Sequence, residues 1–265
     1  MQRLLPLVCA AWALALPAAA DLVITQTEKT EGAKVAGVQR PGKEKTEVLW
    51  IGKDRLRSEV GNRVTIVRAD LAKLFLVDTQ AQTFSAVELP IVIEKHLPAA
   101  VAEVLVPTIQ QTKVRVTPTT ETKTINGWST TRYTLTLTTA AGATTNEDVW
   151  VTKDVPAEFA KLQELRAAQL SATMFGVSPA AELKKLDGIA VLVERSGNEM
   201  GVETKSRTEV RAIETKAPPE GLYDVPKDFK EVPFDPLSDG SRKAPGALPK
   251  DGDAESKDKP APRGG

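Results

Sequence analysis

Few side chains in this sequence have the types and spacing that catalysis or metal binding requires. The chain has 265 residues but only one cysteine, Cys9, and one histidine, His96. A single cysteine excludes a disulfide framework, and a single histidine excludes most histidine-based metal sites. His96 could serve as a general base, but it follows Lys95 and precedes Pro98 without any partner motif. We therefore interpret His96 as a solvated residue at the start of a helix.

The common catalytic motifs are absent from residues 21–265. This region has no G-x-S-x-G, H-E-x-x-H, P-loop or G-x-G-x-x-G motif, which removes the usual nucleophile, zinc and phosphate signatures. Paired carboxylates need no local motif, so a hydrolase that uses Asp and Glu stays open. Glu147 and Asp148 are the densest pair on a predicted strand, but strand neighbours point to opposite faces. We predict no catalytic residue, no metal and no cofactor.

Large apolar side chains provide the candidate ligand-binding residues. Trp50, Trp128 and Trp150 all fall in predicted β-segments. One interpretation is an apolar pocket for an acyl chain or another apolar ligand. Core packing, or a half-exposed ring, is the simpler interpretation of the same residues. With three residues of a predicted long helix, the predicted ligand-binding set is Trp50, Trp128, Trp150, Phe159, Leu162 and Met174.

Composition narrows the class of protein further. The chain has 35 basic and 35 acidic residues, so its formal net charge is zero. Nucleic-acid binders need a basic face to neutralise phosphates, and this balance argues against one. The length allows one large or two small domains with a real core. We find no internal repeat at a solenoid period.

The first twenty residues have the pattern of a secretory signal peptide. Arg3 is their only charge, residues 4–16 are mostly apolar, and residues 18–20 are three alanines before Asp21. The apolar run is shorter than the roughly 20 residues of a spanning helix. Val8 directly before Cys9 argues against a lipidated cysteine. We predict cleavage after Ala20, a periplasmic location, and no transmembrane segment after cleavage.

The segment 22–89 alternates short β-runs with turn residues. Its runs lie at residues 22–24, 47–51, 55–60, 63–68, 73–77 and 83–87, and the last five are about ten residues apart. This spacing predicts an antiparallel meander.

The second half mixes helices and strands. We predict helices at residues 96–106, 154–175 and 178–186, with Asp154 and Ser178 as N-caps. Strands are expected at residues 112–117, 132–138, 146–152, 189–193 and 201–213. In the last strand, one face is charged and the other, from Val202 to Ala212, is small and weakly polar. We expect that small face to lie under a helix or to border an internal space.

Two further segments complete the domain organisation. Residues 222–229 read LYDVPKDF and predict a docking segment near the end of the fold. Residues 238–265 are dominated by Pro, Gly, Lys and Asp, and such a segment cannot bury enough surface to offset its ordering entropy. We predict a signal peptide at 1–20, a single β-rich domain at 21–237 and a disordered tail at 238–265.

The order of these elements resembles a known family. The resemblance rests on an export signal followed by residues 50–57 (WIGKDRLR), 122–128 (TKTINGW), 149–154 (VWVTKD) and 222–229 (LYDVPKDF). Together they look like an uncharacterised family of bacterial periplasmic proteins related to the LolA/LolB lipoprotein-carrier fold. The resemblance implies an α+β, mainly antiparallel fold: an incomplete curved β-barrel, or half-barrel, covered by one long helix and one or two short ones. It also implies an apolar cavity under the helix.

Three functional hypotheses follow. The first is a non-enzymatic periplasmic protein that binds a lipid-like or other apolar ligand between the curved sheet and the helix. The second is an envelope module that binds another protein through a sheet edge or the tail. The third is an unrecognised hydrolase that uses carboxylates.

Overall fold

The computed structural model describes residues 20–35, 38–139, 142–155, 157–174, 176–199 and 202–237. The predictions for residues 1–19 and for the tail at 238–265 fall outside this part of the chain, and the predicted domain limits stay a prediction. The described residues form an α+β fold that is mainly antiparallel β.

A twelve-stranded open sheet is the body of the fold. Its strands in spatial order are β14 (Lys230–Glu231), β8 (Thr83–Glu88), β7 (Lys73–Asp78), β6 (Arg63–Arg68), β5 (Arg55–Val60), β4 (Lys43–Ile51), β1 (Asp21–Thr30), β13 (Val202–Lys216), β12 (Ile189–Glu199), β11 (Thr144–Thr152), β10 (Trp128–Thr138) and β9 (Lys113–Ile125). Only β14 is parallel to its neighbour. A separate ladder joins β2 (Ala33–Val35) and β3 (Val38–Arg40).

The predicted meander is confirmed in β4 to β8. Each of these strands pairs with the next one along the chain, because tight turns join them. Gly61, with a φ of 59°, makes one such turn in the left-handed region that glycine tolerates. β1 instead lies between β4 and β13, and so it joins the two halves of the chain in one sheet.

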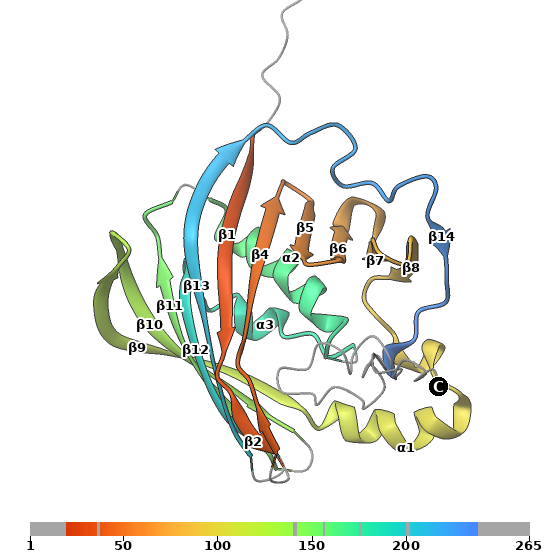
Figure 1. Cartoon of the computed structure of the whole chain (residues 1–265), viewed down its shortest axis with the longest axis horizontal. Coiled ribbons are helices and arrows are strands. Elements are labelled where there is room, and N and C mark those ends of the chain that lie inside the picture. The colour runs from red at the N-terminus through yellow and green to blue at the C-terminus, as the bar shows by residue number, and fades with distance from the viewer. Residues whose placement is uncertain are drawn as a thin grey trace, which may run out of the picture.

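The sheet is curved, and the helices lie on its concave side (Figure 1). Helix α2 (Phe159–Ser171) lies against β5 and β6, and helix α3 (Ala180–Leu183) lies against β9. Helix α1 (Ala99–Gln110) follows the 3-10 turn η2 (Ile93–His96) at one end of the sheet, and a second 3-10 turn, η1 (Ala69–Leu71), joins β6 to β7. The sheet does not close into a barrel.

The long helix is shorter than the sequence predicts, and Asp154 is not its N-cap. Helix α2 begins at Phe159, and its N-cap residue Glu158 makes no capping hydrogen bond through its side chain. The carboxylate of Asp154 instead accepts a hydrogen bond from the backbone N–H of Ser129 at 2.7 Å. The cap prediction is wrong, because α2 begins further along the chain and the Asp154 carboxylate bonds to the neighbouring hairpin.

The strands of the second half also differ from the prediction. The strand expected at 112–117 continues to Ile125 as β9, and the turn expected at 197–198 lies within β12. In β13 the pairing partners of Thr25 and Gln26 are Ala212 and Val210, which places a bulge between these two residues of β13. Val210 and Ala212 therefore lie on opposite faces, and the predicted small face is interrupted there.

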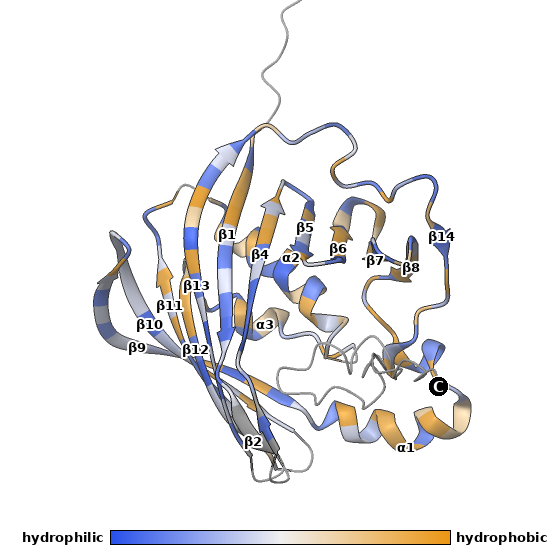
Figure 2. Ribbon diagram, viewed as in Figure 1, coloured by the Kyte–Doolittle hydropathy of each residue, from blue (hydrophilic) through white to orange (hydrophobic). Residues whose placement is uncertain are grey.

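The apolar core lies between the concave face and α2. Leu49, Leu56 and Leu74 of the sheet belong to one buried cluster with Leu162 and Leu165 of α2. Figure 2 shows hydrophobic residues concentrated in the parts of the strands near α2, with more polar residues toward the far ends of β1 and β4. Hydrophobic burial is the main stabilising contribution here.

The C-terminal segment, residues 217–232, covers the opposite, convex face of β4 to β8. Tyr223 is buried there with Val64, Ile66 and Val77. Arg57 donates a hydrogen bond to the carbonyl oxygen of Leu222 at 3.0 Å. The predicted docking of residues 222–229 is confirmed, and the N-terminal half of the sheet is covered on both faces.

Candidate functional site

The concave face extends beyond α2 along the middle strands. On β13, the side chains of Thr204, Ser206 and Thr208 are half-buried, whereas Lys205 and Arg207 between them are exposed. The alternation places the hydroxyl side chains on the concave face and the long charged ones on the convex face. Small, half-buried hydroxyl side chains therefore line the concave face of β13.

One polar cluster on this face centres on Glu47 of β4. Its Oε1 accepts a hydrogen bond from Ser58 Oγ at 2.5 Å, and its Oε2 accepts one from Gln26 Nε2 at 2.5 Å. From α2, Gln169 Nε2 lies 3.4 Å and an Arg166 guanidinium nitrogen 3.8 Å from Oε1. Several donors therefore stabilise this carboxylate at the border between the apolar core and the hydroxyl-bearing strands.

A second polar cluster is the ion pair of Glu147 on β11 and Arg195 on β12. Two guanidinium nitrogens of Arg195 lie 2.6 Å and 2.5 Å from Glu147 Oε1. The side chains are only 14% and 26% exposed, respectively. Arg195 on β12 lies between Glu147 on β11 and Ser206 on β13, since it pairs in register with both.

Apolar side chains adjoin this ion pair. Leu135 of β10 is the direct cross-strand neighbour of Glu147 and is half-buried against the cluster of Tyr133, Val149 and Leu183. The concave face therefore changes from apolar on β10 to charged on β11 and β12, and to hydroxyl-bearing on β13. A surface with this gradient can hold a molecule that has an apolar part and a polar end.

The helices on the concave side are fixed by polar contacts. Gln163 of α2 is buried and donates a hydrogen bond to the carbonyl oxygen of Gly188 at 3.1 Å. Glu182 of α3 accepts one from the backbone N–H of Val116 at 2.7 Å. The Lys185 ammonium, and then this N–H, hold the pKa of the Glu182 carboxyl below its usual value. Both contacts stabilise the walls beside the candidate site.

The predicted ligand-binding residues are not all brought together. Trp150 and Leu162 belong to the large core cluster, and Trp128 and Phe159 pack against it. Trp50 packs instead with Tyr223 under the C-terminal segment, because it alternates with Leu49 and Ile51 and points to the convex face.

Two members of that set have distinct surroundings. Val149 and Val151 pack in a separate cluster with Leu183 of α3. Trp150, between them in sequence, has the Lys123 ammonium 3.7 Å from its ring centroid. Met174 is half-buried in the turn after α2. A ligand-binding role for the six residues stays a prediction.

The structure also shows the surroundings of the candidate catalytic groups His96, Glu147 and Asp148. The ring of His96 lies edge-on to Phe234, with centroids 5.1 Å apart. Glu147 faces Arg195, whereas Asp148 lies 3.7 Å from Arg132 on the opposite face, as the alternation predicts. Within the described ranges, no three His, Cys, Asp or Glu residues gather in a way that could hold a metal ion.

Sequence reasoning missed the polar residues of the concave face. Gln26 and Glu47 occupy positions that alternate in phase with Ile24, Leu49 and Ile51, all of which are buried. A polar residue on the apolar face of a strand was therefore the available signal. Their meeting with Arg166 of α2 has no local signal, because it depends on how the helix crosses the sheet.

By its fold, the protein is an α+β protein built on an open, curved antiparallel sheet. Its sequence places the chain in a family. Residues 41–229 match the domain family of unknown function DUF4412, and the chain belongs to that family. No curated protein matches it. In the part of the chain that the structure describes, no helix has the length and apolar character needed to cross a membrane.

Proposed function

We propose that this protein is a non-enzymatic binding protein that holds an amphipathic, lipid-like molecule on the concave face of its sheet. The observation that carries the proposal is the Glu147–Arg195 ion pair, which is mostly buried and lies beside half-buried Leu135. The apolar part of the ligand packs on β10, and its polar end meets Arg195 and the hydroxyls of β13.

The proposal includes a distant relationship to the LolA/LolB lipoprotein-carrier fold. A curved, open antiparallel sheet with helices against its concave side supports it (Figure 1). The α2 side chains Leu162 and Leu165 are buried against the sheet. The ligand surface that we propose therefore lies beside α2, over β10 to β13, rather than beneath the buried face of that helix.

Export to the periplasm, with removal of residues 1–20, is part of the same proposal. Besides the signal-like sequence, the position of Asp21 supports it. Asp21 is the first residue of β1, is buried, and accepts a hydrogen bond from Tyr223 Oη at 2.7 Å. Strand β1 thus begins at the residue that follows the predicted cleavage site.

A binding role, rather than catalysis, rests on how the concave carboxylates are held. Glu47 accepts hydrogen bonds from Ser58 and Gln26, and Glu147 pairs closely with Arg195. Carboxylates in such contacts are already engaged with protein donors, whereas a general acid or base must reach a substrate.

Displacement of a fluorescent fatty acid from protein purified from the periplasm tests the proposal, together with native mass spectrometry of the same sample. We expect binding of the probe, and about tenfold weaker binding by Arg195→Met, because a charged hydrogen bond contributes about 1.5–3 kcal/mol. Arg207→Met is the matched control, since Arg207 makes a similar ion pair on the convex face.

Equal loss of affinity in both variants would place the site elsewhere. A protein that carries no lipid and ignores the probe would exclude the proposed function.

A further inference from the structure

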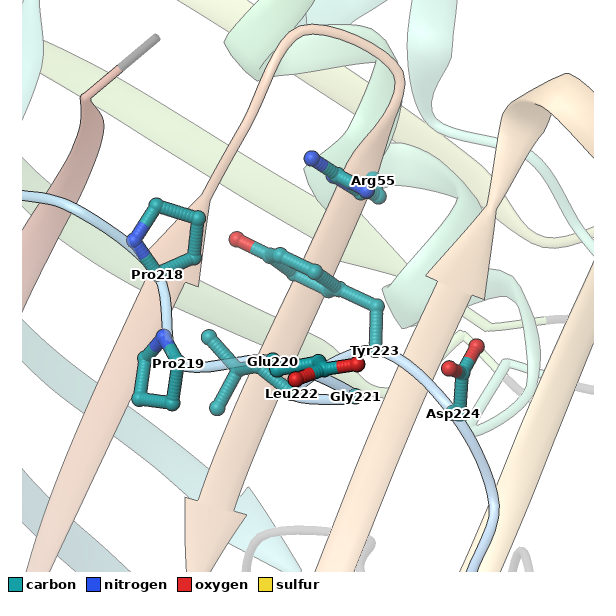
Figure 3. A pocket seen from close by; sticks show the side chains of 8 residues that line it. All are labelled: Arg55, Pro218, Pro219, Glu220, Gly221, Leu222, Tyr223 and Asp224. Atoms are coloured by element: carbon teal, nitrogen blue, oxygen red, sulfur yellow. The ribbon is translucent and has the colours of Figure 1, made fainter. Parts of the chain in front are cut away.

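A pocket of about 230 Å³ lies on the other side of the molecule, where the C-terminal segment passes the start of β5. Its apolar walls are Pro218, Pro219 and Leu222, and Arg55 and Glu220 bring a positive and a negative charge to it. Figure 3 shows the Tyr223 ring between Arg55 and Leu222. Among these lining residues, only Arg55 comes from the sheet.

Tyr223 makes the pocket rigid. Its ring is buried, and its hydroxyl donates a hydrogen bond to Asp21 Oδ2 at 2.7 Å. Burial, and then the bond to Asp21, raise the pKa of the phenol far above its usual value, so that it remains a donor. The guanidinium carbon of Arg55 lies 4.7 Å from the centroid of this ring. A cation–π contact therefore holds Arg55 over a fixed surface.

Two other arginines near the pocket, Arg57 and Arg68, are paired with carboxylates. Arg57 lies 2.5 Å from Glu59. Arg68 lies 2.7 Å from Asp70 and 3.2 Å from Asp224.

Arg55 and Glu220 are different. Over the described ranges, neither side chain takes part in an ion pair or a side-chain hydrogen bond, apart from the stacking of Arg55 on Tyr223. The pocket therefore presents the exposed Arg55 guanidinium, whose charge also helps to lower the pKa of Asp70, and the exposed Glu220 carboxylate beside apolar walls.

We propose that this pocket binds a small apolar α-amino acid. Arg55 receives the carboxylate of the ligand, Glu220 receives its ammonium group, and the apolar side chain packs against Pro218, Pro219 and Leu222. The volume supports this size, since it equals about eight water volumes of ~30 Å³ each, and leucine has nine non-hydrogen atoms. The inference is independent of the lipid-binding proposal, because it concerns the opposite face.

Titration of ¹⁵N-labelled protein with L-leucine tests the inference, with the amide resonance of Gly221 as the reporter. Two probes share the leucine skeleton: 4-methylpentanoate lacks the ammonium group, and 3-methylbutylamine lacks the carboxylate. Because each charged contact adds to affinity, we expect leucine to bind about tenfold more tightly than either probe. Equal affinity for leucine and 4-methylpentanoate would overturn the role of Glu220, and an unmoved Gly221 resonance at millimolar leucine would overturn the site.

Two variants separate the charges. Arg55→Met keeps an apolar stem over Tyr223 and is expected to weaken leucine binding by about tenfold. Glu220→Gln is expected to weaken the binding of leucine but not of 4-methylpentanoate. Arg115→Met removes an exposed arginine from β9, at the far edge of the sheet, and is expected to change neither.

Glu220 is exposed, so Glu220→Gln keeps the inference testable even if Arg55→Met fails to fold. Unchanged leucine affinity in Glu220→Gln would contradict the inference.

Discussion

The two faces of β11 to β13 carry ion pairs of the same chemical kind in different surroundings. Arg195 and Glu147 on the concave face lie 2.5 Å apart with side chains 26% and 14% exposed. Arg207 and Glu194 on the convex face lie 2.6 Å apart with side chains 48% and 44% exposed. Glu194 and Arg195 are consecutive in the sequence, so only the alternation of the strand separates these environments.

The difference shows that the face of the sheet, rather than the residue type, sets what such a pair contributes. An exposed pair contributes about 0–1 kcal/mol, because water and salt screen it and two long side chains lose freedom. Removal of one partner of a shielded pair leaves the other charge poorly solvated, which costs more. The concave face therefore places charge where its interactions are strong.

The largest effect is expected in the covered part of the concave face. Leu165→Ala removes a buried side chain of α2 and should lower the free energy of unfolding by about 3 kcal/mol, through lost burial and a new cavity. Urea unfolding measures this change. Leu170→Ala, at a half-buried position of the same helix, should cost less, and an equal cost would mean that α2 does not pack on the sheet through Leu165.

The second effect concerns the shielded ion pair. Arg195→Met should destabilise the protein by about 1–3 kcal/mol, because Glu147 loses its partner while remaining mostly shielded from water. The same urea measurement on Glu147→Gln/Arg195→Met should recover part of the loss. If the double variant is less stable than the single one, the cost arises from packing and not from the unpaired charge.

The third effect tests the covered half of the convex face. Tyr223→Phe removes the hydroxyl that donates to buried Asp21 and should cost about 1–2 kcal/mol. Thermal unfolding monitored by circular dichroism is the measurement. In an Asp21→Asn background, Tyr223→Phe should cost less, because a buried neutral amide depends less on a hydrogen-bond donor than a buried carboxylate does. An unchanged cost of Tyr223→Phe would argue against this explanation.

A smaller effect depends on pH. The pKa of Glu182 in the folded protein lies below its ordinary value of 4.5. Its ionised form therefore stabilises the fold above about pH 4.5, and this contribution is lost as the pH falls through the lowered pKa. Glu182→Gln should cost less than about 1 kcal/mol at pH 6. In urea unfolding between pH 6 and pH 3, its difference from the unmodified protein should shrink, and a constant difference would refute the assignment.

The smallest effect is expected for the exposed ion pair. Arg207→Met should change the free energy of unfolding by less than about 0.5 kcal/mol. Urea unfolding at low and high salt is the measurement, and any loss should fall further at high salt. A loss equal to that of Arg195→Met would remove the distinction between the two faces.

Much of the fold could be predicted because its signals are local. The runs that became β4 to β8 are each flanked by turn residues, and their side chains alternate within six to nine residues. The opposite directions of Glu147 and Asp148 follow from the same alternation. The start of α2 was misplaced: the helix begins at Phe159, and Asp154 bonds instead to Ser129, twenty-five residues away along the chain.

The candidate site was less predictable than the strands. Trp50 was placed with Trp150 by residue type alone, but the structure packs it under Tyr223, which is far away in sequence. The Glu47 cluster likewise needs Arg166 from α2. The position of Trp50 or of Glu47 on a strand does not indicate which face of the sheet a distant helix or segment will cover.

By itself, the sequence determined the mainly β character, the meander and the alternation of each strand, because backbone conformation and side-chain direction are properties of neighbouring residues. Only the tertiary structure decided that β1 pairs with β13, that α2 covers one face and that residues 217–232 cover part of the other. These pairings join residues as far apart as Asp21 and Lys216. They are set by which arrangement buries the most apolar surface while satisfying the buried polar groups, which is a property of the whole chain.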